Sequence, residues 1–264
     1  MEIINIAAYK FLSIEDCPSW QEALQERCDA LELRGTIILA NEGINIVLAG
    51  ARESIDAMVQ FMKTAPLFGG DLADLDIKES VSDYKPFGKM VVRVAREIIT
   101  MRVPQVDPRK SRAPVVDSET LDRWLEKGCD DDGNEVVMLD TRNTYETDIG
   151  SFEGAIKLEI ERFSEFPEAV RKQLEEDKGL KNKTVVSFCT GGIRCEKAVL
   201  LMNEMDMPRA YQLEGGILKY FEKTGGKHWD GECFVFDDRV AVDKSLNETK
   251  QDYPRHIGPR DTMK

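Results

Sequence analysis

Residues 185–197 place the strongest constraint on the fold of this chain. Val185 to Phe188 is an apolar run that predicts a buried strand ending at Cys189. A six-residue loop, from Cys189 to Arg194, contains two glycines, and the residues from Arg194 to Met205 predict a helix. A buried strand that feeds a loop and a helix is typical of a parallel sheet, where ligands bind beyond the carboxyl ends of the strands. The segment therefore predicts an α/β domain with a site at this loop.

The loop has the chemistry of an anion cradle with a thiol at its base. Gly191 and Gly192 let the backbone curl so that successive N–H groups point into the loop, and the helix start adds a positive dipole end. Such a field favours a thiolate or a persulfide anion at Cys189. A lone cysteine at a strand end is ordinarily a small buried hydrophobe, but this one has a complete cradle. The residues expected to stabilise its charge are Thr190, Gly191, Gly192, Ile193 and Arg194.

Cys195 follows the loop in the first helical turn. It could act as a resolving thiol or second sulfur site, or it could simply pack on a helix face. The narrow geometry of disulfides argues against a strain-free bond between Cys195 and Cys189. The other cysteines, Cys17, Cys28, Cys129 and Cys233, have no comparable context and are expected to be structural or incidental.

The length of 264 residues indicates two domains, at roughly 150 residues each. The first hundred residues follow a β-α-β-β-α-β order with an added strand, which is the ferredoxin-like pattern. Strands are expected at 3–12, 36–39, 44–48, 75–81 and 90–99, with helices at 18–33 and 51–64. The expected boundaries are an amino-terminal domain at 1–103, a proline-punctuated linker at 104–116, the α/β domain at 117–226 and an extension with a loose tail at 227–264.

In the second half, short apolar strands alternate with helices, as expected for a largely parallel sheet. Strands are predicted at 136–140, 183–188 and 210–213, and helices at 117–127, 163–178 and 194–205.

The net charge of −13 argues against affinity of the whole surface for nucleic acid, but one basic segment lies between Lys85 and Arg112. It is either a solvated strand face with a charged linker or a surface that grips nucleic-acid phosphates. The candidate phosphate contacts are Lys85, Lys89, Arg93 and Arg96.

The chain has no apolar run near the roughly 18 residues of a membrane span and no signal-peptide pattern, so a cytoplasmic protein without membrane contacts is expected. The six cysteines are too few and too irregular for a disulfide scaffold and are expected to be reduced. His228 and His256 have no partner at metal-ligand spacing, and no glycine-rich dinucleotide motif precedes a helix. The sequence thus indicates no metal site and no recognisable cofactor.

Three motifs resemble the rhodanese fold of sulfurtransferases, whose loop cysteine carries a persulfide. They are the loop itself, the run from Asp140-Thr141-Arg142 through Glu146 to Gly154-Ala155, and Leu213-Glu214-Gly215-Gly216-Ile217. The resemblance implies that Asp140 and Arg142 are structural supports. The loop is one residue shorter than in the related phosphatases, whose loop is sized for a phosphate ester. The shorter loop favours sulfur transfer over a phosphatase activity.

The whole chain resembles the bacterial tRNA uridine hydroxylase family. The resemblance rests on Ala40-Asn41-Glu42-Gly43-Ile44-Asn45, on the loop from Cys189 to Lys197, and on the segment from Gly231 to Val240. It implies an α/β fold in which a rhodanese-like parallel-sheet domain follows an α+β ferredoxin-like (βαββαβ), acylphosphatase-like domain. It also implies hydroxylation of the wobble uridine of tRNA, with molecular oxygen as co-substrate and Cys189 as the catalytic cysteine.

Two departures from that family limit what carries over. Ile46-Val47 stands where many relatives have Gly-Thr, which weakens any role for this hairpin, and no cysteine follows Cys233 to form a cysteine-rich metal segment. Glu42 and Asn45 could line a cleft or serve turn chemistry.

Two other functions stay open on the sequence. One is a plain sulfurtransferase that passes sulfur from a persulfide to a small thiol or a partner protein. The expected partners of the hydroxylase are tRNA and, where Cys189 carries a persulfide, a sulfur-donor protein. The other is a non-catalytic binding module, against which the intact Cys189 argues. The oligomeric state is left open.

Overall fold

The amino-terminal unit is built on a five-stranded sheet with the strand order β4-β1-β3-β2-β5. In the computed structural model, which describes residues 2–249 and 251–252, the chain divides into two units, 1–100 and 101–264. The first unit consists of β1 (Ile3–Phe11), α1 (Cys17–Ala30), β2 (Arg34–Ala40), β3 (Gly43–Gly50), α2 (Arg52–Thr64), a 3-10 turn (Pro66–Phe68), β4 (Ile77–Ser82) and β5 (Met90–Val94).

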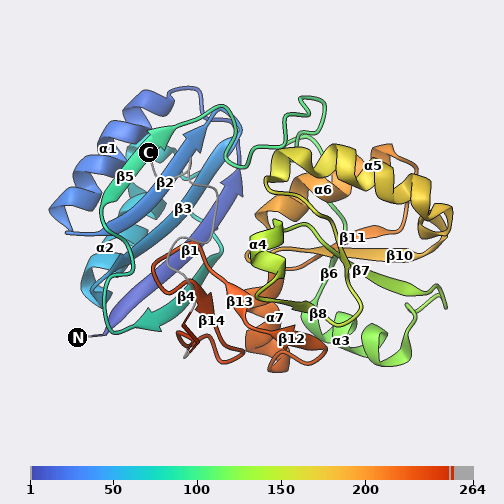
Figure 1. Cartoon of the computed structure of the whole chain (residues 1–264). Helices are drawn as coiled ribbons and strands as arrows, with labels where there is room; N and C mark the ends of the chain where they lie inside the picture. Colours follow the sequence, from blue (N-terminus) through green and yellow to red (C-terminus); the bar gives the residue numbers. More distant parts are fainter. Residues whose placement is uncertain (1, 250, 253–264) are drawn as a thin grey trace. The chain divides into compact units, whose positions relative to one another are not determined.

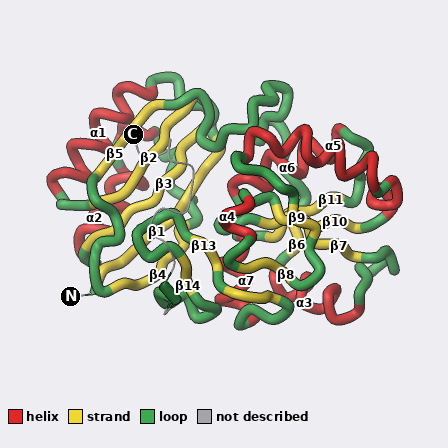
Figure 2. Tube along the Cα trace, viewed as in Figure 1, coloured by secondary structure: helices red, strands yellow, loops and turns green. Residues whose placement is uncertain are grey.

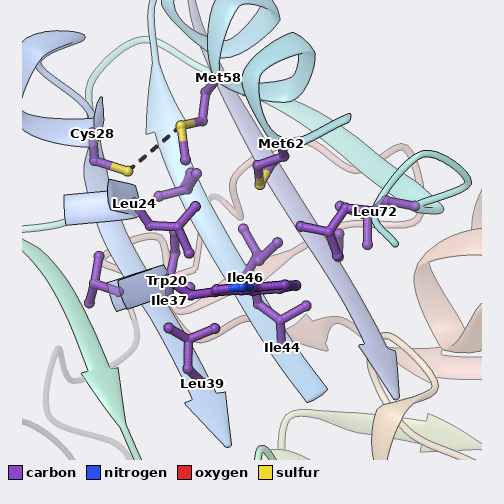
Figure 3. Close-up of a cluster of buried hydrophobic side chains, with 14 of the residues drawn as sticks. Trp20, Leu24, Cys28, Ile37, Leu39, Ile44, Ile46, Met58, Met62 and Leu72 are labelled. Carbon is purple, nitrogen blue, oxygen red and sulfur yellow. Dashed lines mark hydrogen bonds between the residues drawn. The ribbon is translucent and has the colours of Figure 1, made fainter. Parts of the chain in front are cut away.

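This arrangement confirms the ferredoxin-like pattern with its added strand. The strands β1, β3, β2 and β4 pair antiparallel, whereas β5 joins the edge of the sheet parallel to β2. Both helices cover one face of the sheet (Figure 1). Their buried side chains, among them Trp20, Leu24, Cys28, Met58 and Met62, meet the inward side chains of the strands (Figure 3).

The added strand is shorter than the predicted range of 90–99. β5 ends at Val94, and the N–H of Ile98 is then bonded by the Glu42 carboxylate at 2.8 Å. Asn45 Nδ2 donates to the carbonyl of Ile98 at 3.3 Å. Side chains of the β2–β3 hairpin thus replace a strand partner, which a hydrophobicity pattern does not show. Strand β4 also differs slightly from the range of 75–81, because it begins at Ile77.

The second unit is built on a parallel five-stranded sheet with the order β6-β11-β10-β7-β9. Its elements are β6 (Val115–Val116), α3 (Ser118–Lys127), β7 (Val136–Asp140), α4 (Thr144–Thr147), β8 (Gly150–Phe152), β9 (Ile156–Lys157), α5 (Phe166–Glu176), β10 (Thr184–Phe188), α6 (Ile193–Glu204), β11 (Ala210–Leu213), α7 (Gly216–Thr224), β12 (Trp229–Gly231), β13 (Cys233–Phe234) and β14 (Ala241–Val242). Short 3-10 helices span Phe163–Glu165 and Lys178–Asn182.

Helices cover both faces of this parallel sheet, with α5 and α6 on one side and α3 and α7 on the other (Figures 1 and 2). This places the β10–α6 loop at the carboxyl edge of a central strand. All five residues of β10 are buried, as expected for a strand that is covered on both faces. The predicted helix at 163–178 is interrupted, since a 3-10 turn precedes Phe166 and the α-helix ends at Glu176.

The carboxy-terminal extension packs onto the second unit. β12 pairs with β8, and β13 pairs with β14 to form a hairpin. The predicted extension at 227–264, with its loose tail, is bonded to itself as far as Thr249, whose N–H donates to the Ala241 carbonyl at 3.1 Å. Residues 250 and 253–264 of that predicted tail lie outside the described residues. No helix among the described residues is long and apolar enough to cross a membrane.

Candidate active site

The loop after β10 wraps backbone N–H groups around the sulfur of Cys189. The Gly192 N–H donates to Cys189 Sγ at 3.1 Å, and α6 begins at the next residue, Ile193. Gly192 has φ +98°, a left-handed backbone that a residue with a side chain rarely adopts. The Cys189 side chain is buried, with only 1% of the residue exposed.

These donors change the acidity of the thiol. Burial alone would raise the Cys189 pKa, but a hydrogen bond from Cys195, the charge of Arg194 and the backbone N–H groups of Arg194 and Gly192 outweigh it. The pKa falls from an ordinary 9.0 to about 5, so Cys189 is a thiolate at neutral pH.

The other shifted thiols move the opposite way. Burial raises the pKa of Cys28 and of Cys233 to about 12, and it also raises that of Cys17. Only Cys189 combines burial with a set of donors that stabilises the anion. Among the thiols whose pKa is shifted, Cys189 is therefore the activated one.

Cys195 lies within hydrogen-bond reach of the Cys189 sulfur and is fully buried. Burial and the neighbouring thiolate together raise the Cys195 pKa well above its ordinary value, so Cys195 keeps its proton and donates a hydrogen bond to the Cys189 sulfur. Its own sulfur lies 3.6 Å from Thr141 Oγ1 at the end of β7. In this geometry Cys195 is a hydrogen-bond donor to the thiolate rather than a second anion.

Arg194 is paired with a carboxylate that lies 48 residues earlier in the chain. Its Nη1 and Nη2 donate to the two oxygens of Glu146 at 2.6 and 2.7 Å, and both side chains are buried. Planar bidentate pairs of this kind are strong and directional. The guanidinium therefore acts on the thiolate by its charge, while its N–H groups are held by Glu146.

Glu146 is the residue that sequence reasoning missed at this site. It lies within the motif that resembles the rhodanese signature, in which the resemblance assigns a structural role to Asp140 and Arg142 and no separate role to Glu146. Its Oε2 also accepts the backbone N–H of Asn143, which fixes the start of the short helix α4. The sequence signal for Glu146 is its position in the same motif as Asp140 and Arg142, in a short segment (140–146) with two acidic residues and one arginine.

The start of α7 supports the loop from behind. The N–H groups of Ile217 and Leu218 donate to the carbonyls of Cys189 and Thr190 at 3.0 and 3.2 Å. A Cβ at Gly216 would lie 2.4 Å from the Cys189 carbonyl oxygen, closer than any real Cβ contact. The Leu213–Ile217 segment thus needs glycine at this position because the loop packs directly against its backbone.

Asp140 and Arg142 form a buried pair below the loop. Arg142 Nε and Nη2 donate to the two Asp140 oxygens at 2.9 and 2.7 Å, and Nη2 also reaches the Gly150 carbonyl at 2.6 Å. Ser151 Oγ donates to Asp140 as well, at 2.7 Å. The pair ties β7 to β8, as expected for structural supports.

The four candidate phosphate contacts of the basic segment lie on the amino-terminal unit, whereas its basic residues from Arg102 to Arg112 belong to the second unit. Lys89, Arg93 and Arg96 are exposed, whereas Lys85 is half-buried and donates to the Glu32 carbonyl at 2.7 Å. Lys85 and Lys89 line a hollow of about 440 Å³ together with Asp29, Glu32 and Arg34. Positive and negative side chains share this hollow. Arg93 on β5 and Arg96 just after it are not among its lining residues.

One group of potential metal ligands gathers among the described residues, away from the loop. The ligand atoms of Asp122, Glu126 and His228 lie within 4.8 Å of one another. The Lys227 ammonium already approaches Asp122 at 2.8 Å and Glu126 at 3.3 Å, so the cluster carries its own cation. The sequence did not show this grouping, because His228 lies far along the chain from α3. His256 lies outside the described residues.

Comparison with known proteins covers both units. A family model described as UPF0176 acylphosphatase like domain matches residues 3–98, and a model described as Rhodanese-like domain matches residues 119–223. Many curated relatives carry the name tRNA uridine(34) hydroxylase, and three of them illustrate the similarity. The protein of Bordetella avium is 56% identical over 93% of this chain and 99% of its own length. Those of Paraburkholderia xenovorans and Burkholderia vietnamiensis are 51% and 52% identical over 95% of this chain and 86% and 87% of theirs.

The match thus spans both units and includes the loop of Cys189. On this evidence the chain belongs to the tRNA uridine(34) hydroxylase family.

Proposed function

We propose that this protein hydroxylates C5 of uridine 34 in tRNA, giving 5-hydroxyuridine. The observation that carries the proposal is the extent of the family match, over nine-tenths of the chain and across both units, together with an intact thiolate loop. A protein of this kind acts where tRNA is found, in the cytoplasm.

The reaction has a defined balance. Replacing the C5 hydrogen by a hydroxyl is a two-electron oxidation of the uracil ring. With molecular oxygen as co-substrate, one oxygen atom enters the product and the other leaves as water, which takes two electrons and two protons from an external reductant. Such chemistry is often performed by a bound cofactor. The loop residues supply a nucleophilic sulfur anion, and the two electrons come from the external reductant.

We assign the reactive sulfur to Cys189, as a thiolate or as its persulfide. The backbone N–H groups of the loop and the positive charge of Arg194 stabilise the anion, and Cys195 donates a hydrogen bond to it. These contacts are formed before substrate arrives, so the sulfur needs no separate base to remove its proton at neutral pH.

The basic residues of the amino-terminal unit are the proposed phosphate contacts. Exposed arginine and lysine side chains bind the tRNA backbone by charge and release counterions, so binding would weaken steeply with salt. Lys85 contributes least, because its ammonium is already bonded to a backbone carbonyl. The members of this proposed surface are Lys85, Lys89, Arg93 and Arg96.

The test is complementation. tRNA from cells that lack this protein, with and without the wild-type gene restored, is digested and analysed by nucleoside mass spectrometry. Appearance of 5-hydroxyuridine only in the complemented cells supports the proposal. Absence of the nucleoside in cells shown to express the protein refutes it, and a parallel assay of sulfur transfer from thiosulfate to cyanide would then test the sulfurtransferase, including its need for a sulfur-donor protein.

A further inference from the structure

Phe236 presents an aromatic ring to solvent next to the thiolate loop. It is 54% exposed and is the one phenylalanine among the exposed large apolar side chains of the described residues. It lies in the turn between β13 and β14, two residues after Phe234. An exposed apolar ring is not unusual by itself, so its surroundings decide what it does.

The turn that carries Phe236 is braced on both sides. The Val235 N–H donates to the Val240 carbonyl at 2.9 Å, and the Val240 N–H donates to the Asp237 carbonyl at 3.0 Å. Asp237 and Arg239 form an ion pair at 2.6 Å with both side chains almost fully buried. The ring is therefore mounted on a fixed backbone rather than on a loose loop.

The ring is also tied to the active loop. Its centroid lies 5.0 Å from that of Phe234 in an edge-on arrangement, and the Arg194 guanidinium carbon lies 5.7 Å from its centroid. Thr190 Oγ1 donates to the Phe234 carbonyl at 3.3 Å. The same arginine that stabilises the Cys189 thiolate thus borders the exposed ring.

Modification of a base within RNA requires that the base leave its stack and enter the site. Proteins hold such unstacked bases on aromatic side chains, and every base offers a π-face for this contact. The Cys189 sulfur is buried. The uracil ring of the substrate must therefore be held beside the loop for its C5 atom to approach this sulfur.

We propose that Phe236 is the stacking platform for the uracil ring of the substrate. This inference rests on the proposed function. The Phe236 ring takes the place of the neighbouring base in the anticodon stack, and the braced β13–β14 turn holds it ready before RNA binds. Phe236 is a positioning residue, since the chemistry belongs to the sulfur.

The first experiment is photocrosslinking. A tRNA anticodon stem-loop with 5-iodouridine at position 34 is bound to the full-length protein and irradiated at long ultraviolet wavelength, and the crosslinked peptide is mapped by mass spectrometry. We expect the crosslink at Phe236 and its loss in Phe236→Ala. A crosslink of equal yield in Phe236→Ala, or none at Phe236 when binding is saturated, overturns the proposal.

The second experiment separates stacking from apolar contact. Phe236→Ala and Phe236→Leu should each weaken binding of the stem-loop by about tenfold or more, whereas Phe236→Trp should retain it, since base–aromatic contacts of this kind are worth about ten- to a hundredfold. Val115→Ala, at the same 54% exposure in the same unit, is the control and should bind as wild type. Full binding by Phe236→Leu would show that only apolar contact is involved and would overturn the platform.

The two proposals fail in different ways. If wild-type protein does not restore 5-hydroxyuridine in cells, the proposed function fails. If wild type restores it and Phe236→Ala restores it to the same level, the function stands and the platform alone is wrong. Thermal unfolding of each variant, expected to match wild type because the ring is exposed, shows that a loss is not a loss of fold.

Discussion

Removing one charge from the Arg194–Glu146 pair should destabilise the second unit strongly. The change is Glu146→Gln, which keeps the shape of the side chain but removes its negative charge. The pair is bidentate, with contacts of 2.6 and 2.7 Å, and the side chains are 5% and 0% exposed. The variant therefore leaves the Arg194 guanidinium buried without its carboxylate.

The structure sets the size of the effect. Breaking a buried ion pair by removing one partner costs about 3–5 kcal/mol. The Cys189 thiolate stays near Arg194 and offsets part of the loss, so we expect the lower end, about 3 kcal/mol. In a unit of this size that corresponds to a fall of roughly 6–12 °C in the melting temperature.

Differential scanning calorimetry measures this shift, and the chain offers a matched control. Arg52 and Glu79 form an ion pair at 2.8 Å whose side chains are 45% and 46% exposed, and exposed pairs contribute about 0–1 kcal/mol. Glu79→Gln should therefore hardly move the melting temperature. If Glu146→Gln destabilises the protein no more than Glu79→Gln, the buried Arg194–Glu146 pair does not stabilise the second unit more than an exposed pair would. The double variant Glu146→Gln with Arg194→Met should recover part of the lost stability, because no buried guanidinium is left without its carboxylate. The Cys189 thiolate loses the charge of Arg194 in this variant, so the recovery stays incomplete.

Three further predictions concern the loop and the basic surface. The ultraviolet absorbance of the Cys189 thiolate, taken as the difference from Cys189→Ser, should appear as the pH rises through about 5. Since folding lowers this pKa from 9.0, the stability that the thiolate adds is present in full above pH 9.0 and is lost as the pH falls through about 5. Cys195→Ala should move the absorbance midpoint upward, and an unchanged midpoint would contradict the assigned hydrogen bond. Gly216→Ala should cost about 2 kcal/mol or more in urea unfolding, whereas Gly191→Ala, whose added methyl meets nothing within 4 Å, should cost much less; equal costs would refute the close packing at Gly216. Charge reversal of Lys89, Arg93 and Arg96 should greatly weaken tRNA binding at low salt in gel-shift titrations. Unchanged binding would refute the proposal that these residues bind tRNA phosphates.

The sequence allowed the strands β7, β10 and β11 and the helices α3, α5 and α6 of the second unit to be predicted, because their signals are local. β10 is an unbroken apolar run, and the two glycines after Cys189 need a loop rather than a longer strand. The cap of α3 is equally local, since the Asp117 side chain accepts the Thr120 N–H at 2.9 Å. Where residues close in sequence determine the structure, patterns of hydrophobicity and turn residues suffice.

The contacts that sequence reasoning did not supply join distant parts of the chain. The position of Glu146 at Arg194 depends on how α4 lies beside the β10–α6 loop, and periodicity carries no information about that. The shortened β5 has the same cause, because side chains of the preceding hairpin bond Ile98. In the sequence, Phe236 is one residue of the segment from Gly231 to Val240 that resembles the family. Its contact with Arg194 joins residues that are 42 positions apart, so only the structure shows it.

The measurement that tests the central claim most directly is the level of 5-hydroxyuridine in tRNA from cells that lack this protein and carry Cys189→Ser. The control is Cys129→Ser, a half-buried cysteine of the same unit outside the loop. The account predicts that wild type and Cys129→Ser restore 5-hydroxyuridine and that Cys189→Ser, expressed to the same level, does not. Full restoration by Cys189→Ser would contradict the claim that the thiolate of this loop performs the reaction.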